Sequence, residues 1–280
     1  MKINLKTYFR LLRKKDARGY FLMAAFGFIL SKGFLFPLQD ILLFWAIIFL
    51  LLGFGFSIND CFDLREDRLD PTKKNPIVLG QISLKKALVF SISLAILGLF
   101  LSSLFGLRVF LFCLITTLIS LFYSSPPLRL KSRFLLDLIS HGLFAGSLIF
   151  FLPLMILKTQ LTLFYYLIAF SLFCFSIILE LRNQTEEYQS DKLAGLKNTT
   201  LILGKEKSEK LLKILSTFYP LTLFPIFNLF SNQYFLLFLV QTSIFLFLFL
   251  FFQNQKFVKN YKLIDAYVIL SLGLLLIATR

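Results

Sequence analysis

The sequence has little charge for its length. Only 16% of its 280 residues are Asp, Glu, Lys or Arg, whereas 58% are hydrophobic and 37 are phenylalanine. A soluble domain cannot bury that much apolar surface, but a bundle of transmembrane helices can place it against lipid. The shortage of charge therefore excludes an ordinary soluble protein and indicates an integral membrane protein.

Cysteine and histidine are also scarce. The three cysteines, Cys61, Cys113 and Cys174, are far apart in the chain and show no CxxC or other metal-binding spacing. We therefore expect them to be small apolar side chains rather than disulfides or metal ligands. The single histidine, His141, lies inside an apolar run, where we favour a hydrogen bond between packed helices over a role as catalytic base.

Long apolar runs fill most of the chain. Open sheets would leave unpaired backbone groups in lipid, and the runs are too long for barrel strands, so we predict helices. No soluble appendage or Gly/Ser-rich linker separates the runs. Residues 1–280 are therefore expected to form one all-α membrane domain of about nine helices, with cytoplasmic helical caps over a central apolar cavity. The predicted spans are 20–37, 40–58, 87–106, 109–124, 134–157, 161–181, 214–230, 233–252 and 263–279.

Lys and Arg are unevenly divided between alternate loops. The N-terminal arm and the loops after the second, fourth, sixth and eighth runs contain 26 of them, and the other face contains four. Because cytoplasmic loops carry such an excess, we predict that the N-terminus and the long loops are cytoplasmic and that the C-terminus is on the opposite side. The net charge of +15 then needs no nucleic-acid partner, since basic loops face an anionic leaflet and no basic–aromatic nucleic-acid module is present.

The few acidic residues are concentrated in two of these cytoplasmic loops. Residues 59–80 read NDCFDLREDRLDPTKKNPIVLG and directly follow the second apolar run. Asn59, Asp63 and Asp67 are spaced i, i+4, i+8, so they would project from one face if that helix continues, with Asp60 beside them. Carboxylates four residues apart on a helix repel one another, which favours a bound cation between them.

The loop after the sixth run repeats this spacing. Residues 180–204 read ELRNQTEEYQSDKLAGLKNTTLILG, in which Asn183, Glu187 and Asp191 are again four residues apart. Mg²⁺ prefers oxygen ligands and is usually bound through one or two carboxylates together with substrate phosphates. Two facing helices of this kind can hold two or three Mg²⁺ ions, which can bind a diphosphate. We therefore predict that all six residues are metal ligands, directly or through water.

Paired acidic motifs at the mouth of an apolar bundle fit a lipid diphosphate as substrate. Metal ions that stabilise the leaving diphosphate favour breakage of its bond to an allylic carbon. The resulting carbocation must be kept from water, and aromatic faces can stabilise it through cation–π attraction. A nucleophile of a second substrate, the acceptor, would then capture the cation.

These motifs resemble those of the UbiA superfamily of intramembrane prenyltransferases. The family has NDxxDxxxD after the second of nine helices and DxxxD after the sixth. Asn59, Asp60, Asp63 and Asp67 match the first motif, and Glu187 stands where the second usually has Asp. The resemblance extends over essentially the whole chain. It implies Mg²⁺-dependent transfer of a polyprenyl group from its diphosphate.

A third stretch, YSSPPLRLK at 123–131, is similar to the YSxPPxRxK loop of the same family. By this resemblance Tyr123 is a candidate for stabilising the carbocation, and Arg129 and Lys131 are candidates for contacts with the diphosphate. Lys74 is a further candidate, although ordinary positive-inside charge explains these three basic residues equally well. The predicted catalytic residues are Asp63, Asp67, Glu187, Asp191 and Tyr123, and the predicted substrate contacts also include Asn59, Asp60 and Asn183. Gly80 and Gly195 are expected at turns or helix ends.

The acceptor stays open among an aromatic or quinone precursor, a glycerol phosphate lipid and a carotenoid. Many family members have an Arg-Pro pair where this chain has Lys74-Asn75-Pro76, which argues against the quinone, haem and chlorophyll branches. One alternative is a transporter or channel with a cytoplasmic divalent-cation site, but its ionisable residues would lie deep within the spans. A second is a phosphatidyl-group transferase, but no DGxxAR stretch lies between carboxylates. The oligomeric state is not predicted.

These alternatives can be separated by ligand protection. A polyprenyl diphosphate with Mg²⁺ should stabilise the protein, by about 2.7 kcal/mol at a ligand concentration about 100 times Kd, whereas a cytidine nucleotide should not. The measurement is the thermal unfolding midpoint in detergent with each ligand. Protection by the nucleotide alone would instead identify a phosphatidyl-group transferase.

Overall fold

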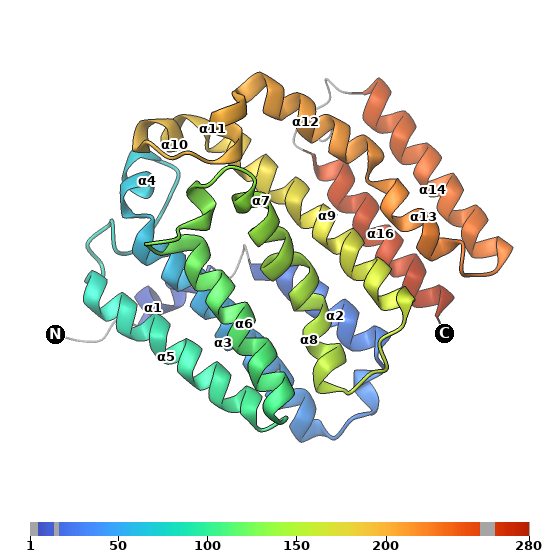
Figure 1. Cartoon of the computed structure of the whole chain (residues 1–280), viewed down its shortest axis with the longest axis horizontal. Coiled ribbons are helices and arrows are strands. Elements are labelled where there is room, and N and C mark those ends of the chain that lie inside the picture. The colour runs from blue at the N-terminus through green and yellow to red at the C-terminus, as the bar shows by residue number, and fades with distance from the viewer. Residues whose placement is uncertain (1–4, 14–16, 253–260, 280) are drawn as a thin grey trace.

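The computed structural model describes residues 5–13, 17–252 and 261–279, and within these ranges the chain forms helices and no strand (Figure 1). Three short helical segments of the described chain are of other types: the 3₁₀ turns η1 (Gly33–Leu35) and η2 (Leu130–Ser132), and the π-helical segment η3 (Gly142–Ser147). The α-helices are α1 (Leu5–Leu11), α2 (Ala17–Leu30), α3 (Leu38–Phe62), α4 (Leu64–Leu69), α5 (Leu84–Ser103), α6 (Leu107–Ser124), α7 (Leu136–His141), α8 (Leu148–Ile156), α9 (Leu163–Glu186), α10 (Tyr188–Ala194), α11 (Thr199–Leu203), α12 (Lys205–Phe218), α13 (Pro220–Phe227), α14 (Asn232–Phe251) and α16 (Lys262–Ala278).

Seven of the described helical segments are long and apolar enough to cross a membrane. Five are the single helices α3, α5, α6, α9 and α14, and two are composite, α7–η3–α8 and α12–α13. The predicted all-helical membrane fold is therefore confirmed. The first and last predicted spans fall on α2 and α16, which have 14 and 17 residues. Because both are shorter than the other seven, the count of nine membrane crossings stays a prediction.

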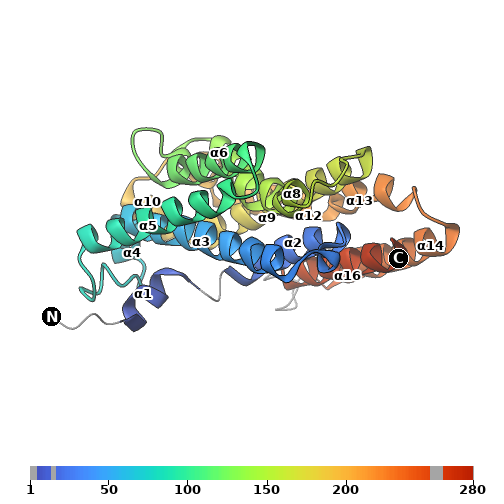
Figure 2. The ribbon, with the colours of Figure 1, turned by 90° about the horizontal axis from the view of Figure 1, so that it is seen from below.

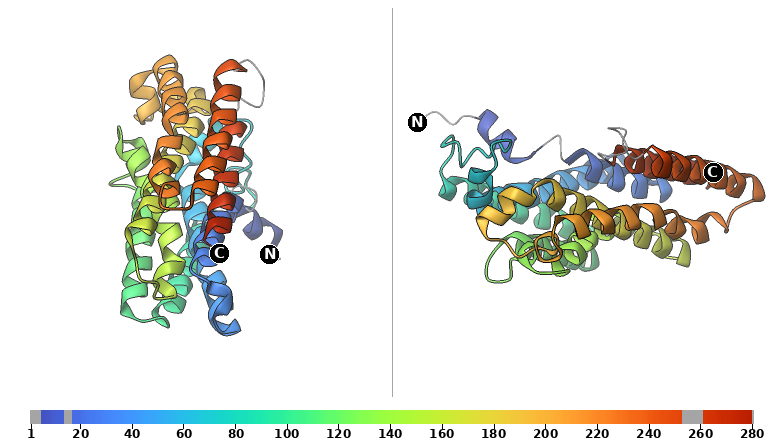
Figure 3. Two further views of the ribbon diagram at one scale, coloured as in Figure 1. Left: turned by 90° about the vertical axis from the view of Figure 1, so that its right-hand side faces the viewer. Right: turned by 90° about the horizontal axis from the view of Figure 1, so that it is seen from above.

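The helices form two layers. One layer contains α2, α3 and α16, and the other contains α6, α8, α12 and α13 (Figures 2 and 3). The largest core cluster joins buried side chains of both layers, among them Phe44, Phe150, Leu172 and Phe227. Many apolar side chains point outwards instead, including Leu42, Ile96 and Phe247, as expected of a surface that faces lipid.

The polar segments gather at one end of this bundle. In Figure 1, α4, α10 and α11 lie together at the upper left, whereas α16 runs towards the opposite end. The start of α16 is tied to the polar end, because Arg182 Nη1 contacts both carboxylate oxygens of Asp265 at 3.1 Å. This arrangement agrees with the predicted alternation of loops, and which side of the membrane the polar end faces stays a prediction.

The described part of the N-terminal arm, residues 5–13, packs against the bundle. Leu11 is fully buried with Cys61, Ile82 and Ala87, and α1 packs against α3 and α5. Arg13 follows directly and has a positive φ of 40°. The packing of α1 therefore carries the guanidinium of Arg13 to the end of α3.

The composite span α7–η3–α8 packs closely against α9. A Cβ built on Gly146 would lie 2.7 Å from the carbonyl oxygen of Leu172, a distance at which something must move. The small residues of η3 therefore let two backbones approach, as is common between membrane helices. Pro153 lies inside the same span, seven residues beyond Gly146.

We predict that Gly146→Ala lowers the free energy of unfolding by about 1–3 kcal/mol, because the added methyl overpacks the contact with α9. Gly273→Ala is the matched control, since a Cβ at Gly273 has no neighbour within 4 Å. It should leave stability unchanged or raise it by up to about 1 kcal/mol, because alanine favours helix. Unfolding in detergent measures both variants, and equal stability of the two would contradict the close packing of η3.

Candidate active site

The helix is interrupted at the same point in both acidic motifs. Asp63 separates α3 from α4 with φ −95° and ψ 19°, and Glu187 separates α9 from α10 with φ −89° and ψ 8°. The helix of the first motif therefore does not continue without a break, which was the condition for its three side chains to share one helix face. In both motifs the middle residue still donates a backbone hydrogen bond to the asparagine carbonyl and accepts one from the last aspartate, at 2.9–3.0 Å. The four-residue spacing survives the interruption, so the three side chains stay on one side of the chain.

Both motifs line a single cavity of about 970 Å³. The short helices α4 and α10 contact each other across its mouth. Deeper in the bundle the lining becomes apolar and aromatic, with side chains such as Ile48, Phe112, Phe144 and Phe175. The predicted metal ligands that line this cavity are Asn59, Asp63, Asp67, Asn183, Glu187 and Asp191. The sequence pattern therefore brings together the six side chains that it singled out, at the polar end of an apolar pocket.

Basic side chains neutralise the carboxylates at this mouth. Lys131 Nζ donates to Asp63 Oδ1, and Lys73 Nζ donates to Glu187 Oε1. Within the described part of the chain, no group of three or more His, Cys, Asp or Glu side chains is close enough to hold a metal ion. The amide and carboxylate oxygens are nevertheless the donor set that Mg²⁺ prefers. A metal ion that took these carboxylates would release both ammonium groups, whose flexible stems allow them to turn towards a phosphate.

Burial of the second motif disfavours its negative charge. Burial, together with the nearby charge of Glu187, raises the pKa of Asp191 to about 7, although Lys131 acts in the opposite direction. Burial also raises the pKa of Glu187, against the opposing effect of Lys73. Because a metal ligand must be deprotonated, binding of a cation here would displace a proton from this cluster.

In each motif, one asparagine outside the motif binds the last aspartate. Asn75 Nδ2 donates to Asp67 Oδ2 at 2.7 Å, and Asn198 Nδ2 donates to Asp191 Oδ2 at 2.8 Å. Both asparagines are buried, and neither was identified as a site residue from the sequence. A signal was available, since an asparagine follows both motifs at a similar distance. The two halves of the site are thus alike in their interruption, their spacing and their supporting amide.

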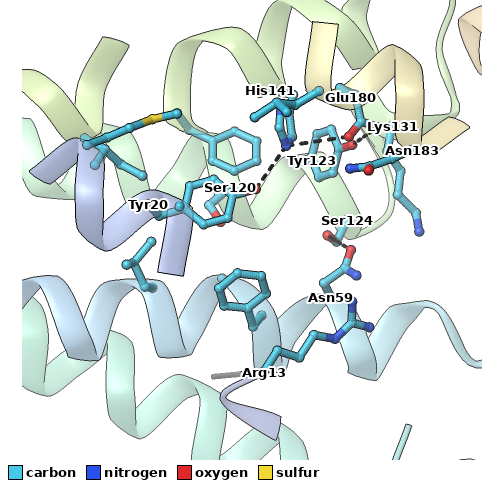
Figure 4. Close-up of a pocket in the computed structure, with 18 of the residues that line it drawn as sticks. Arg13, Tyr20, Asn59, Ser120, Tyr123, Ser124, Lys131, His141, Glu180 and Asn183 are labelled. Carbon is cyan, nitrogen blue, oxygen red and sulfur yellow. Dashed lines mark hydrogen bonds and ion pairs between the residues drawn. The ribbon is translucent and has the colours of Figure 1, made fainter. Parts of the chain in front are cut away.

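The stretch 123–131, which comprises the end of α6 and the loop after it, reaches the cavity through only some of its predicted residues. The Tyr123 hydroxyl donates to Glu180 Oε1 at 2.6 Å, and its ring lies 5.1 Å from that of Phe144 between centroids. Its neighbour Ser124 donates to Asn59 Oδ1 at 2.8 Å, which joins α6 to the first motif (Figure 4). Lys131 lines the cavity, whereas Arg129 pairs with Glu66 and does not.

The structure separates the adjacent lysines of the loop after α4. Lys73 lines the cavity and pairs with Glu187, whereas Lys74, the residue selected from the sequence, is exposed and lies outside the cavity lining. Arg13 is a second missed residue, because its guanidinium donates to Asp60 and lies 3.9 Å from Asp67 Oδ2. Asp60 is buried behind the lining and supports the first motif through this pair. From the sequence, Lys73 and Arg13 were counted only among the basic residues of the N-terminal arm and the cytoplasmic loops.

The comparisons with known proteins agree with this geometry. The model of the UbiA prenyltransferase family matches residues 20–272. The chain belongs to this family. It is 32% identical over 236 residues to a digeranylgeranylglyceryl phosphate synthase of Saccharolobus solfataricus, covering 81% of this chain and 80% of that protein. It is 30% identical over 211 residues to the synthase of the same name from Methanococcus aeolicus, covering 73% and 71%.

A solved structure has the same fold. It is a UbiA homologue from Archaeoglobus fulgidus bound to GPP and Mg²⁺, with a TM-score of 0.72 and 25% identity over 98% of each chain. The protein is therefore a multi-pass membrane enzyme, a prenyltransferase, as the motifs predicted. Membership of this family favours the enzyme over the transporter or channel that the sequence left open.

We predict that Lys73→Ala lowers kcat/KM for prenyl transfer by about tenfold or more, because it removes a charge-assisted contact at the mouth. Lys74→Ala is the matched control, since the same change one residue along lies outside the cavity lining. It should stay within about twofold of the unaltered enzyme, as is usual for an exposed loop charge. Steady-state kinetics of both variants checks this, and the reverse order of the two effects would restore Lys74 as the contact.

Proposed function

We propose that this enzyme transfers a polyprenyl group from an allylic diphosphate, such as geranylgeranyl diphosphate, to a free hydroxyl of a glycerol phosphate lipid. The observation that carries the proposal is the meeting of two acidic motifs at the polar mouth of one apolar cavity. The name digeranylgeranylglyceryl phosphate synthase, borne by relatives that span most of the chain, supports the glycerol phosphate as acceptor.

Mg²⁺ is the proposed cofactor. The residues that would hold it are Asn59, Asp63 and Asp67 from one motif, and Asn183, Glu187 and Asp191 from the other. When bound, Mg²⁺ would neutralise the diphosphate and stabilise it as a leaving group. The bound GPP and Mg²⁺ of the Archaeoglobus fulgidus homologue support this assignment.

The remaining groups at the mouth suit the two ends of the donor. Lys131 and Lys73, once released from their carboxylates, would donate to the oxygens of the diphosphate. The apolar depth of the cavity would take the polyprenyl chain, and the rings of Tyr123 and Phe144 would face the allylic cation. Because this region is lined mainly by apolar side chains, it would also keep water from the cation.

The acceptor would enter the cavity in the same orientation as the donor, with its anionic head at the mouth and its tail in the apolar depth. A glycerol phosphate lipid also has an anionic head and an apolar tail, and guanidinium groups of Arg13 and Arg182 line the mouth beside the lysines. Such groups favour bidentate contacts with phosphate. A carotenoid would make no use of a second anion contact.

The test is prenyl transfer by the purified protein in nanodiscs, with labelled geranylgeranyl diphosphate and Mg²⁺. The acceptors are geranylgeranylglyceryl phosphate, an aromatic acid, phosphoribosyl diphosphate and a carotenoid. We expect product only with the glycerol phosphate, and none when EDTA replaces Mg²⁺.

Asp63→Ala and Asp191→Ala should each lower the transfer rate by about 10²-fold or more, because each removes a carboxylate proposed to bind metal. The matched control is Asp70→Ala in the same loop, because Asp70 bonds to Thr72 and lies outside the cavity lining. It should keep near-normal activity. If product forms with another acceptor, only the proposed acceptor is wrong. Full activity of both motif variants would overturn the assignment of the metal ligands.

A further inference from the structure

A polar cluster lies on the wall of the cavity, beside the second acidic motif. His141, at the end of α7, lines the cavity together with Tyr20 of α2, Tyr123 of α6 and Glu180 of α9 (Figure 4). The imidazole is almost entirely buried, with 5% of the residue exposed. The reaction proposed above gives this histidine no role.

The hydrogen bonds of His141 determine which ring nitrogen carries a proton. Nδ1 lies 2.9 Å from Ser176 Oγ and 3.2 Å from the Ser176 carbonyl oxygen, which can only accept. The Ser176 hydroxyl donates its own hydrogen to the His141 carbonyl oxygen at 3.1 Å. Nδ1 must therefore be the donor, and in the neutral ring the lone pair is on Nε2.

Nε2 faces a carboxylate and the cavity. It lies 3.5 Å from Glu180 Oε2 and 3.4 Å from the Tyr20 hydroxyl. The other oxygen, Glu180 Oε1, already accepts from Tyr123 and from Gln184. A proton arriving at Nε2 would therefore form an imidazolium directly beside a carboxylate that is held in place.

The second carboxylate near His141 does not compete for Nε2. Asp137, on the same helix as His141, is engaged by Thr199 and by Gln184. Tyr20 and Tyr123 approach from the neighbouring helices with hydroxyls that can donate to Nε2 and to Glu180. Glu180 is thus the carboxylate nearest to Nε2, at 3.5 Å.

We propose that Nε2 of His141 is the general base that removes the proton of the acceptor hydroxyl. The inference rests on the proposed function, because transfer to a hydroxyl must release one proton. The hydroxyl oxygen forms the new bond to the allylic carbon, and the bond from that carbon to the diphosphate breaks with its electron pair on the diphosphate. The hydroxyl proton passes to Nε2 and then to solvent. Ser176 is a positioning residue, because it fixes the tautomer.

The first test measures kcat for two single variants of the full-length enzyme, His141→Gln and His141→Ala. General-base catalysis contributes about 10²–10⁴-fold, so kcat for transfer to geranylgeranylglyceryl phosphate should fall by that factor in both variants. Mg²⁺-dependent binding of geranylgeranyl diphosphate should stay within about threefold, since the hydrogen bonds and the ion pair of His141 go to Tyr20, Ser176 and Glu180, none of which is a proposed metal ligand. Added imidazole should restore part of the activity of His141→Ala, an effect that loss of packing would not give.

The second test compares two serines of α9. Ser176→Ala removes the hydroxyl that accepts from Nδ1 and leaves the backbone carbonyl oxygen, so the ring is held less firmly. It should lower kcat more than it changes KM, with a shifted pH profile. Ser171→Ala is the matched control, because it removes a buried hydroxyl that bonds to Tyr219 and Thr222, outside the cavity lining. It should leave both kcat and the pH profile unchanged.

The outcomes separate this inference from the proposed function. An active wild-type enzyme with an equally active His141→Gln variant overturns the general base and leaves the proposed function intact. A wild-type enzyme that binds the donor but prenylates no hydroxyl acceptor overturns both. Impaired donor binding in both His141 variants, with no rescue by imidazole, would show a structural role and overturn the inference.

Discussion

The polar end of this protein is organised by the need to compensate buried carboxylates. Asp60, Asp63, Asp67 and Asp191 are all buried at the mouth of an otherwise apolar bundle. An uncompensated charge in such a place is strongly destabilising, and removing one partner of a buried pair costs about 3–5 kcal/mol. Each acidic group is therefore held by a lysine, a guanidinium or an asparagine amide.

This requirement explains why distant segments converge on one place. The N-terminal arm folds back to supply Arg13, the loop after α4 supplies Lys73, and the loop after α6 supplies Lys131. Neither motif is neutralised only from within its own loop. The mouth of the cavity is consequently a junction of four chain segments, and its chemistry depends on the packing of all four.

The sequence was sufficient to predict the helical class, the family and the six side chains that meet at the mouth. The helical class and the family are confirmed, and the six side chains line one cavity, because these features depend on composition and on a four-residue spacing, which are local. The role of the six side chains as metal ligands stays a prediction. The interruptions at Asp63 and Glu187 were missed because the backbone hydrogen bonds keep that spacing across them. The glycines expected at turns, Gly80 and Gly195, do have positive φ values of 68° and 76°.

The partners of the carboxylates could not be predicted, because they are remote in sequence. Lys73 and Glu187 are 114 residues apart, and nothing local distinguishes Lys73 from Lys74. The choice depends on which side chain turns inwards once α4 and α10 meet. His141 makes the expected helix-packing contact, a hydrogen bond with Ser176 of α9. Its other ring nitrogen faces Glu180, four residues further along α9, and nothing in the sequence indicated this second contact.

The docking of α1 also bears on the order in which the site is built during synthesis. Arg13 precedes Asp60 in the chain, so a partner for this buried acid has already left the ribosome when α3 is inserted. Lys73 is likewise made before Glu187, whereas Asp63 emerges before its partner Lys131. Asp63 is thus the one acid of these three pairs that is synthesised before its basic partner.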